Sequence, residues 1–125
     1  MNSLLVMLGG AVGALARYQF GRLALAGFGP GFPWGTLGVN LIGGLAMGLL
    51  AGSLARFSTG SGESLRLLLG VGVLGGFTTF SAFSLDTMLM LERGEIASAL
   101  FYVAVSVGGS VLALFCGLFL IRTIA

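Results

Sequence analysis

Apolar residues dominate four long stretches of the chain, and short polar or glycine- and proline-rich segments separate them. Each stretch exceeds the roughly 20 residues that a helix needs to cross a hydrocarbon core of about 30 Å. The sequence therefore predicts an all-α integral membrane protein: a single membrane domain over residues 1–125 with transmembrane helices at about 3–26, 34–55, 66–91 and 96–121. The connection between the last two stretches is short, so we expect them to form an antiparallel hairpin.

The third stretch has the least regular sequence, and we expect its helix to break near the middle of the membrane. Glycine costs about 1 kcal/mol relative to alanine in a helix, and β-branched threonine weakens a helix too. A break frees backbone groups that hydrocarbon cannot satisfy, so it must be buried in protein, line a water-filled cavity or bind an ion. Phe80 and Phe83 follow the expected break and share one face of the resuming helix. The residues that weaken the helix are Gly70, Gly72, Gly75, Gly76, Thr78 and Thr79.

Three polar features lie inside the apolar stretches, and each has two interpretations. Arg17 lies too deep for simple snorkelling, so it either braces a helix end or attracts anions to a vestibule. The amide of Asn40 either bonds a neighbouring helix or faces a wet pathway. Tyr102, Ser106 and Ser110 repeat every four residues along the fourth stretch. Their hydroxyls either bond back to their own helix or form a polar track for a partly dehydrated ion.

Glycines at intervals of four indicate two faces for close helix packing. The first stretch carries Gly9 and Gly13, and the second carries Gly44, Gly48 and Gly52. We expect the backbone of another helix to approach each of these faces.

Composition narrows the class of protein. With 57% hydrophobic and 8% charged residues, the chain has too little charge to cover the surface of a soluble domain. The net charge of +2 comes without a basic cluster that could follow a phosphate backbone, which argues against nucleic acid as a partner. The chain has no histidine and a single cysteine, Cys116, so we expect no side-chain metal cluster, no internal disulfide and no enzymatic activity.

Arginines are spread almost evenly over the two sides of the predicted topology. Arg56, Arg66 and Arg122 fall on the side of the termini, whereas Arg93 and a snorkelling Arg22 fall on the other side. Because an asymmetry of positive charge sets orientation, this near tie predicts insertion either way up and hence an antiparallel, dual-topology homodimer. The broken helices would then cross at the two-fold axis, where backbone oxygens of both subunits could clamp a cation.

Three stretches of the sequence form a pattern typical of one known family. They are Gly9-Gly10-x-x-Gly13-Ala14-x-x-Arg17-Tyr18, Gly35-Thr36-Leu37-x-Val39-Asn40-x-x-Gly43 and Gly75-Gly76-Phe77-Thr78-Thr79-Phe80-Ser81-Ala82-Phe83-Ser84. In order, spacing and chain length, they resemble the fluoride channels called Fluc or CrcB. The resemblance implies a dual-topology homodimer in the cytoplasmic membrane, with two pores that export toxic fluoride passively.

The resemblance also implies roles for individual residues. It places a structural sodium ion at the dimer centre, held by the backbone carbonyls of Gly75 and Thr78. Two positions depart from the family: Ala82 replaces a frequent threonine and Asp86 a frequent glutamate, which affects polar details of the vestibule but not the class. The residues that would meet fluoride are Phe80, Phe83, Asn40, Ser81, Tyr102, Ser106 and Ser110.

Two other functions suit a short four-helix chain. A small dual-topology exporter coupled to protons would need a carboxylate in mid-membrane. All acidic residues of this chain lie near span ends or in connections: Glu63, Asp86, Glu92 and Glu95. A non-conducting membrane assembly protein could use the same glycine faces for packing, and only a measurement of ion flux separates it from a channel.

Overall fold

The computed structural model describes residues 1–57 and 62–124, and the regular elements of these residues are helices. Four helical segments are long and apolar enough to cross a membrane, and their bounds lie within four residues of the predicted spans. The third segment is composite, because a π-helix and a break interrupt it. The elements are α1 (Asn2–Phe28), α2 (Trp34–Phe57), α3 (Gly62–Leu65), the π-helix η1 (Arg66–Leu74), α4 (Gly75–Phe77), α5 (Phe80–Glu92) and α6 (Ile96–Ile124).

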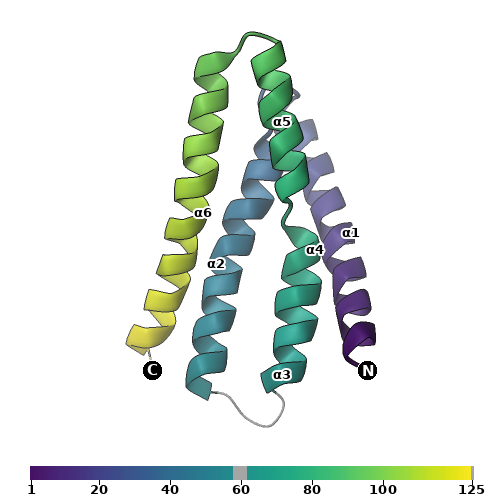
Figure 1. Cartoon of the computed structure of the whole chain (residues 1–125), viewed down its shortest axis with the longest axis vertical. Coiled ribbons are helices and arrows are strands. Elements are labelled where there is room, and N and C mark those ends of the chain that lie inside the picture. The colour runs from purple at the N-terminus through teal and green to yellow at the C-terminus, as the bar shows by residue number, and fades with distance from the viewer. Residues whose placement is uncertain (58–61, 125) are drawn as a thin grey trace.

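The spans run up and down, so both chain termini lie at one end of the molecule (Figure 1). The α1–α2 turn and the α5–α6 connection lie at the opposite end, and α5 and α6 form the predicted antiparallel hairpin. Each connection contains a glycine with positive φ, Gly29 at 75° and Gly94 at 80°. Side chains rarely adopt this conformation, so glycine permits both tight reversals.

Close backbone contacts hold α1 against the third span and α2 against α6, as the glycine spacing predicts. A Cβ atom added to Gly13 would lie 2.9 Å from the amide nitrogen of Phe77, and Gly9 faces the same span equally closely. A Cβ atom on Gly44 would lie 2.8 Å from the carbonyl oxygen of Ser110. Only glycine therefore lets these helix backbones approach to their observed separation.

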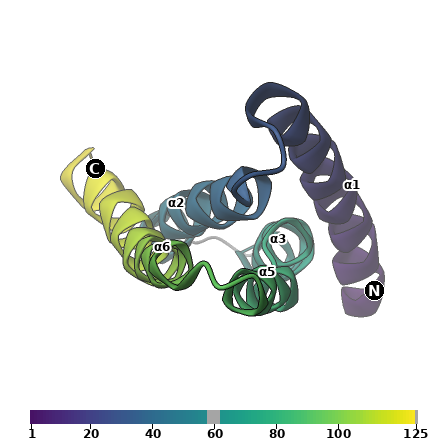
Figure 2. The same cartoon turned by 90° about the horizontal axis from the view of Figure 1, so that it is seen from above.

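Seen from above, α2 lies between α1 and α6, and the third span lies along one side of this row (Figure 2). A small core forms near the α5–α6 connection, from Leu37, Phe83, Met90, Ala99 and Tyr102. Most other large apolar side chains are exposed, as expected for a chain that lipid or a second subunit surrounds.

Candidate functional site

The third span breaks at Thr78 and Thr79, as the sequence predicts (Figure 1). Both residues are extended, with φ and ψ of −86° and 159° at Thr78 and −152° and 124° at Thr79. The Thr79 hydroxyl then caps α5 by accepting a hydrogen bond from the N–H of Ala82 at 3.1 Å. The nine π-helical residues of η1 before the break were not predicted. π-Helical segments are rare, and they are frequent at functional sites.

Asn40 on α2 replaces the hydrogen bonds that the break removes. Its Oδ1 accepts from the N–H of Thr79 at 2.9 Å, and its Nδ2 donates to the carbonyl oxygen of Thr79 at 3.0 Å. One side chain thus satisfies both backbone groups of an extended residue inside the membrane-spanning region. Of the two interpretations of Asn40, the bond to a neighbouring helix is confirmed.

Arg17 on α1 contacts the same region from the other side. Its Nε donates to the carbonyl oxygen of Gly76 in α4 at 3.1 Å, so the guanidinium braces the last helical residues before the break. Arg17 also lines a cavity of about 310 Å³ together with Arg22, Thr36 and Thr79. The bracing contact predicted as one alternative is present, and the cavity leaves the guanidinium next to a space that an anion can enter.

A groove of about 390 Å³ runs between α2, α5 and α6 and collects most of the predicted pathway residues. Phe80 is 77% exposed, whereas Phe83 is 9% exposed, and their ring centroids lie 5.6 Å apart. Aromatic ring edges carry partial positive charge, so this pair can offer edge contacts to an anion. The predicted pathway residues that line the groove are Asn40, Phe80, Phe83, Ser106 and Ser110. Thr78, Thr79 and apolar side chains of α2 and α6 complete its walls.

The serines of α6 differ in their hydrogen bonding. The Ser106 hydroxyl is buried and has no hydrogen-bond partner among the described residues, whereas Ser110 donates to the carbonyl oxygen of Asn40 at 3.5 Å. By contrast, Ser84 and Thr87 on α5 bond back to their own helix at 3.0 and 2.9 Å. A buried polar group without a partner costs about 1–3 kcal/mol, so Ser106 holds an unused hydroxyl beside the groove that it lines.

Two other predicted pathway residues lie outside the groove. Tyr102 is fully buried beneath it, and its hydroxyl donates to Oδ2 of Asp86 at 3.1 Å. Ser81 is exposed on the surface of α5. The sequence placed Tyr102 on the same face as the two serines, whereas the structure gives its hydroxyl a partner on a different helix.

The break also removes the helical donors of several carbonyl oxygens, among them those of Gly75 and Thr78. In an unbroken α-helix, the N–H of residue i+4 donates to the carbonyl of residue i. The N–H of Thr79 donates to Asn40 instead, so the carbonyl of Gly75 lacks its helical donor. The N–H of Ala82 donates to the Thr79 hydroxyl instead, so the carbonyl of Thr78 lacks its helical donor as well. Within residues 1–57 and 62–124, no three His, Cys, Asp or Glu side chains could hold a metal ion together. A cation here would therefore depend on backbone oxygens.

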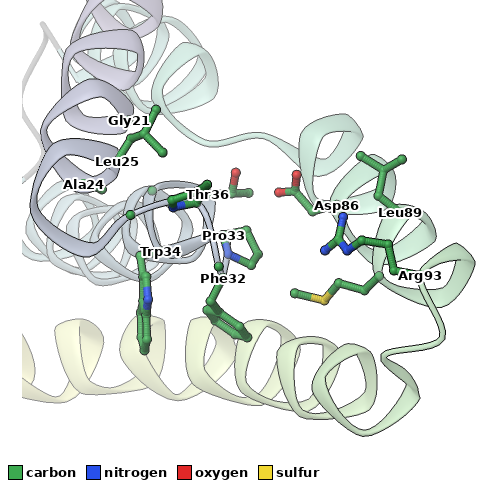
Figure 3. A pocket seen from close by; sticks show the side chains of 15 residues that line it. Gly21, Ala24, Leu25, Phe32, Pro33, Trp34, Thr36, Asp86, Leu89 and Arg93 are labelled. Atoms are coloured by element: carbon green, nitrogen blue, oxygen red, sulfur yellow. The ribbon is translucent and has the colours of Figure 1, made fainter.

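A second cavity, of about 380 Å³, lies at the turn end of the molecule (Figure 3). Asp86 and Arg93 extend into it from α5 and its end, across from Thr36 and Pro33. The Asp86 carboxylate also accepts the hydrogen bond from Tyr102. One side chain thus lines this cavity and contacts the buried core below the groove.

Two residues make contacts at the site that were not predicted from the sequence. Thr79 appeared only as a weak helix former, although it caps α5 and pairs with Asn40. The sequence places Asp86 near an interface and, by the resemblance, at the vestibule, but it does not indicate the bond from Tyr102. The signal for Thr79 was available, because threonine three residues before a helical N–H is a typical N-cap.

Comparison with known proteins supports one family. The family model described as "CrcB-like protein, Camphor Resistance (CrcB)" matches residues 4–118. A protein of Sphingopyxis alaskensis named "Fluoride-specific ion channel FluC" is 60% identical over 98% of this chain and 97% of its own length. A protein of the same name from Novosphingobium aromaticivorans is 57% identical over 96% of this chain and 95% of its own length.

Proposed function

This chain belongs to the CrcB family and, like the relatives it matches, is a fluoride-selective ion channel; we propose that it exports fluoride passively across the cytoplasmic membrane. Passive flow suffices for export because the membrane potential drives anions outward. An interior-negative potential of 100 mV contributes about 2.3 kcal/mol for each charge that leaves. A channel thus needs no other energy source to lower the fluoride concentration of the cell. In this proposal the chain is a transport protein and not an enzyme.

The groove supports this proposal most strongly, because it is lined by the aromatic pair Phe80 and Phe83 and by Ser106, whose hydroxyl has no partner among the described residues. Fluoride is small and strongly hydrated, so a pore must replace its water with hydrogen-bond donors without holding it too tightly. The free O–H of Ser106 and the ring edges of Phe80 and Phe83 provide weak, neutral partners of this kind. Tyr102 continues the track below Ser106 in this proposal, although Asp86 occupies its hydroxyl in the resting geometry.

A second, oppositely oriented copy of the chain would complete the pore. The groove is open on one side, and Phe80 is mostly exposed, so one subunit does not enclose a path for an ion. The near tie of arginines on the two sides supports insertion in both orientations. We infer an antiparallel homodimer with two pores, in which the partner covers α5 and its exposed Ser81.

The freed carbonyls support the proposed structural sodium ion. The oxygens of Gly75 and Thr78 lack helical donors, and Gly75 is exposed where a symmetry-related break could meet it. Two such pairs, one from each subunit, would supply four neutral oxygen ligands, which suits a monovalent cation. The bracing by Arg17 keeps the carbonyl of Gly76 occupied, and the carbonyls of Gly75 and Thr78 stay available as ligands.

Electrical recording across a planar bilayer tests the proposal and separates it from a proton-coupled exporter. With equal pH on both sides and a fluoride gradient, the reconstituted protein should pass a fluoride current that reverses at the fluoride equilibrium potential. Replacing fluoride with chloride should abolish most of the current. A flux that appears only with a pH gradient would favour the exporter, and no flux from folded protein would favour the assembly protein.

Removing sodium tests the central cation separately. The current should disappear when sodium is replaced on both sides by a large organic cation, and it should return when sodium is restored. Full current without sodium would contradict the proposed ion while leaving the channel function intact.

A further inference from the structure

Aromatic rings form a continuous row from the α1–α2 turn to the groove. Phe32 in the turn lies edge-on to Tyr102, with ring centroids 5.5 Å apart and planes at 84°. Tyr102 lies 5.1 Å from Phe83, and Phe83 lies 5.6 Å from Phe80. A segment outside the membrane-spanning helices thus connects, ring by ring, to the aromatic pair of the groove.

The middle of this row is rigid. Tyr102 is fully buried, and its hydroxyl bonds Asp86, so its ring has one well-defined position. Phe32 packs against the same core cluster from the turn and is itself held by Trp34 at 4.8 Å. Because packed side chains lose contact when a neighbour shrinks, removal of the Phe32 ring would free Tyr102 to tilt and Phe83 to follow it.

We propose that Phe32 is a positioning residue of the conduction path, which acts through Tyr102 to fix Phe83 in the groove. It does not meet the ion itself, and the inference rests on the proposed contact of Phe83 with fluoride. The turn then has a second role besides connecting α1 and α2, because it sets the shape of the aromatic constriction.

Single-channel fluoride current tests this inference, since unit current does not depend on how many channels are folded. An aromatic pair contributes enough energy to change a rate by roughly two- to tenfold, so we expect F32L to reduce the unit current by that factor. F32Y keeps the ring and should retain the wild-type current. If F32L yields no assembled channel, F32M takes its place as a flexible side chain of similar volume.

A matched control and a double variant trace the effect to Phe83. F28L removes a ring from the same end of the molecule, but Phe28 is 70% exposed and packs on Trp34 alone among the aromatic contacts described, so its current should not change. In an F83L background, F32L should have almost no further effect. Wild-type current in F32L, or a full additional reduction in the double variant, would overturn the inference. Absence of fluoride current in the wild-type protein would instead refute the proposed function.

Discussion

Substitution of Asn40 gives a specific prediction, because this one side chain bonds both the N–H and the carbonyl oxygen of Thr79 at the break. N40D keeps an oxygen that accepts from the N–H of Thr79. It loses the Nδ2 donor, which in the wild type lies 3.0 Å from the carbonyl oxygen of Thr79. An unsatisfied, partly buried carbonyl costs about 1–3 kcal/mol, and a carboxylate facing it adds repulsion. We therefore expect the N40D protein to assemble as the wild type does but to unfold at a lower temperature.

The same substitution places a negative charge beside the groove. An anion about 4 Å from a carboxylate is repelled by roughly 4 kcal/mol in the partly dry surroundings near a protein surface. Since about 1.4 kcal/mol corresponds to a tenfold change in rate, fluoride efflux should fall by roughly two to three orders of magnitude. Efflux from proteoliposomes at matched protein density, with size-exclusion chromatography of the same sample, measures flux and assembly together.

N40A separates the two effects of that change. It removes both hydrogen bonds to Thr79 without adding charge, so it should lower thermal stability relative to the wild type but conduct better than N40D per assembled channel. Wild-type efflux in N40D would refute the proximity of Asn40 to the ion. Equal stability of N40A and the wild type would refute the brace alone.

Three further substitutions test other parts of the account. F80I should cut fluoride efflux at least tenfold without changing the size-exclusion profile, because it removes an aromatic edge from an exposed position; unchanged efflux would remove Phe80 from the path. G13A should destabilise the fold by about 1–3 kcal/mol in thermal unfolding, whereas G21A, where nothing lies within 4 Å of the added Cβ, should not; equal melting temperatures would contradict the close packing. T79V removes the α5 cap and should cost about 1 kcal/mol by the same measurement, with no loss arguing against the cap.

The sequence predicted the spans and the position of the break because both depend on local properties. Length and apolarity define a membrane helix, and four glycines followed by two threonines oppose helix continuity wherever they occur. The π-helix of η1 is different, since nothing in its leucines, valines and glycines distinguishes it from an α-helix. It forms where the third span packs against the glycine face of α1, which is a tertiary contact.

The partners of the site residues also depend on contacts between helices. That Asn40 meets Thr79 and that Asp86 meets Tyr102 follows from the packing of α2, α5 and α6, and no local pattern contains it. The predicted row of hydroxyls on α6 shows that a four-residue interval does not keep distant residues on one helix face. At 3.6 residues per turn, an interval of four residues drifts by about 40°, so Tyr102 is rotated about 80° from Ser110 and reaches the core instead of the groove.

Efflux from proteoliposomes shows whether the chain is a passive channel selective for fluoride. Vesicles that contain the purified protein and either fluoride or chloride would be diluted under the same potassium gradient, with an ionophore to balance charge. We expect rapid release of fluoride and little release of chloride. Comparable release of both ions, or release of neither from well-folded protein, would refute a fluoride-selective channel.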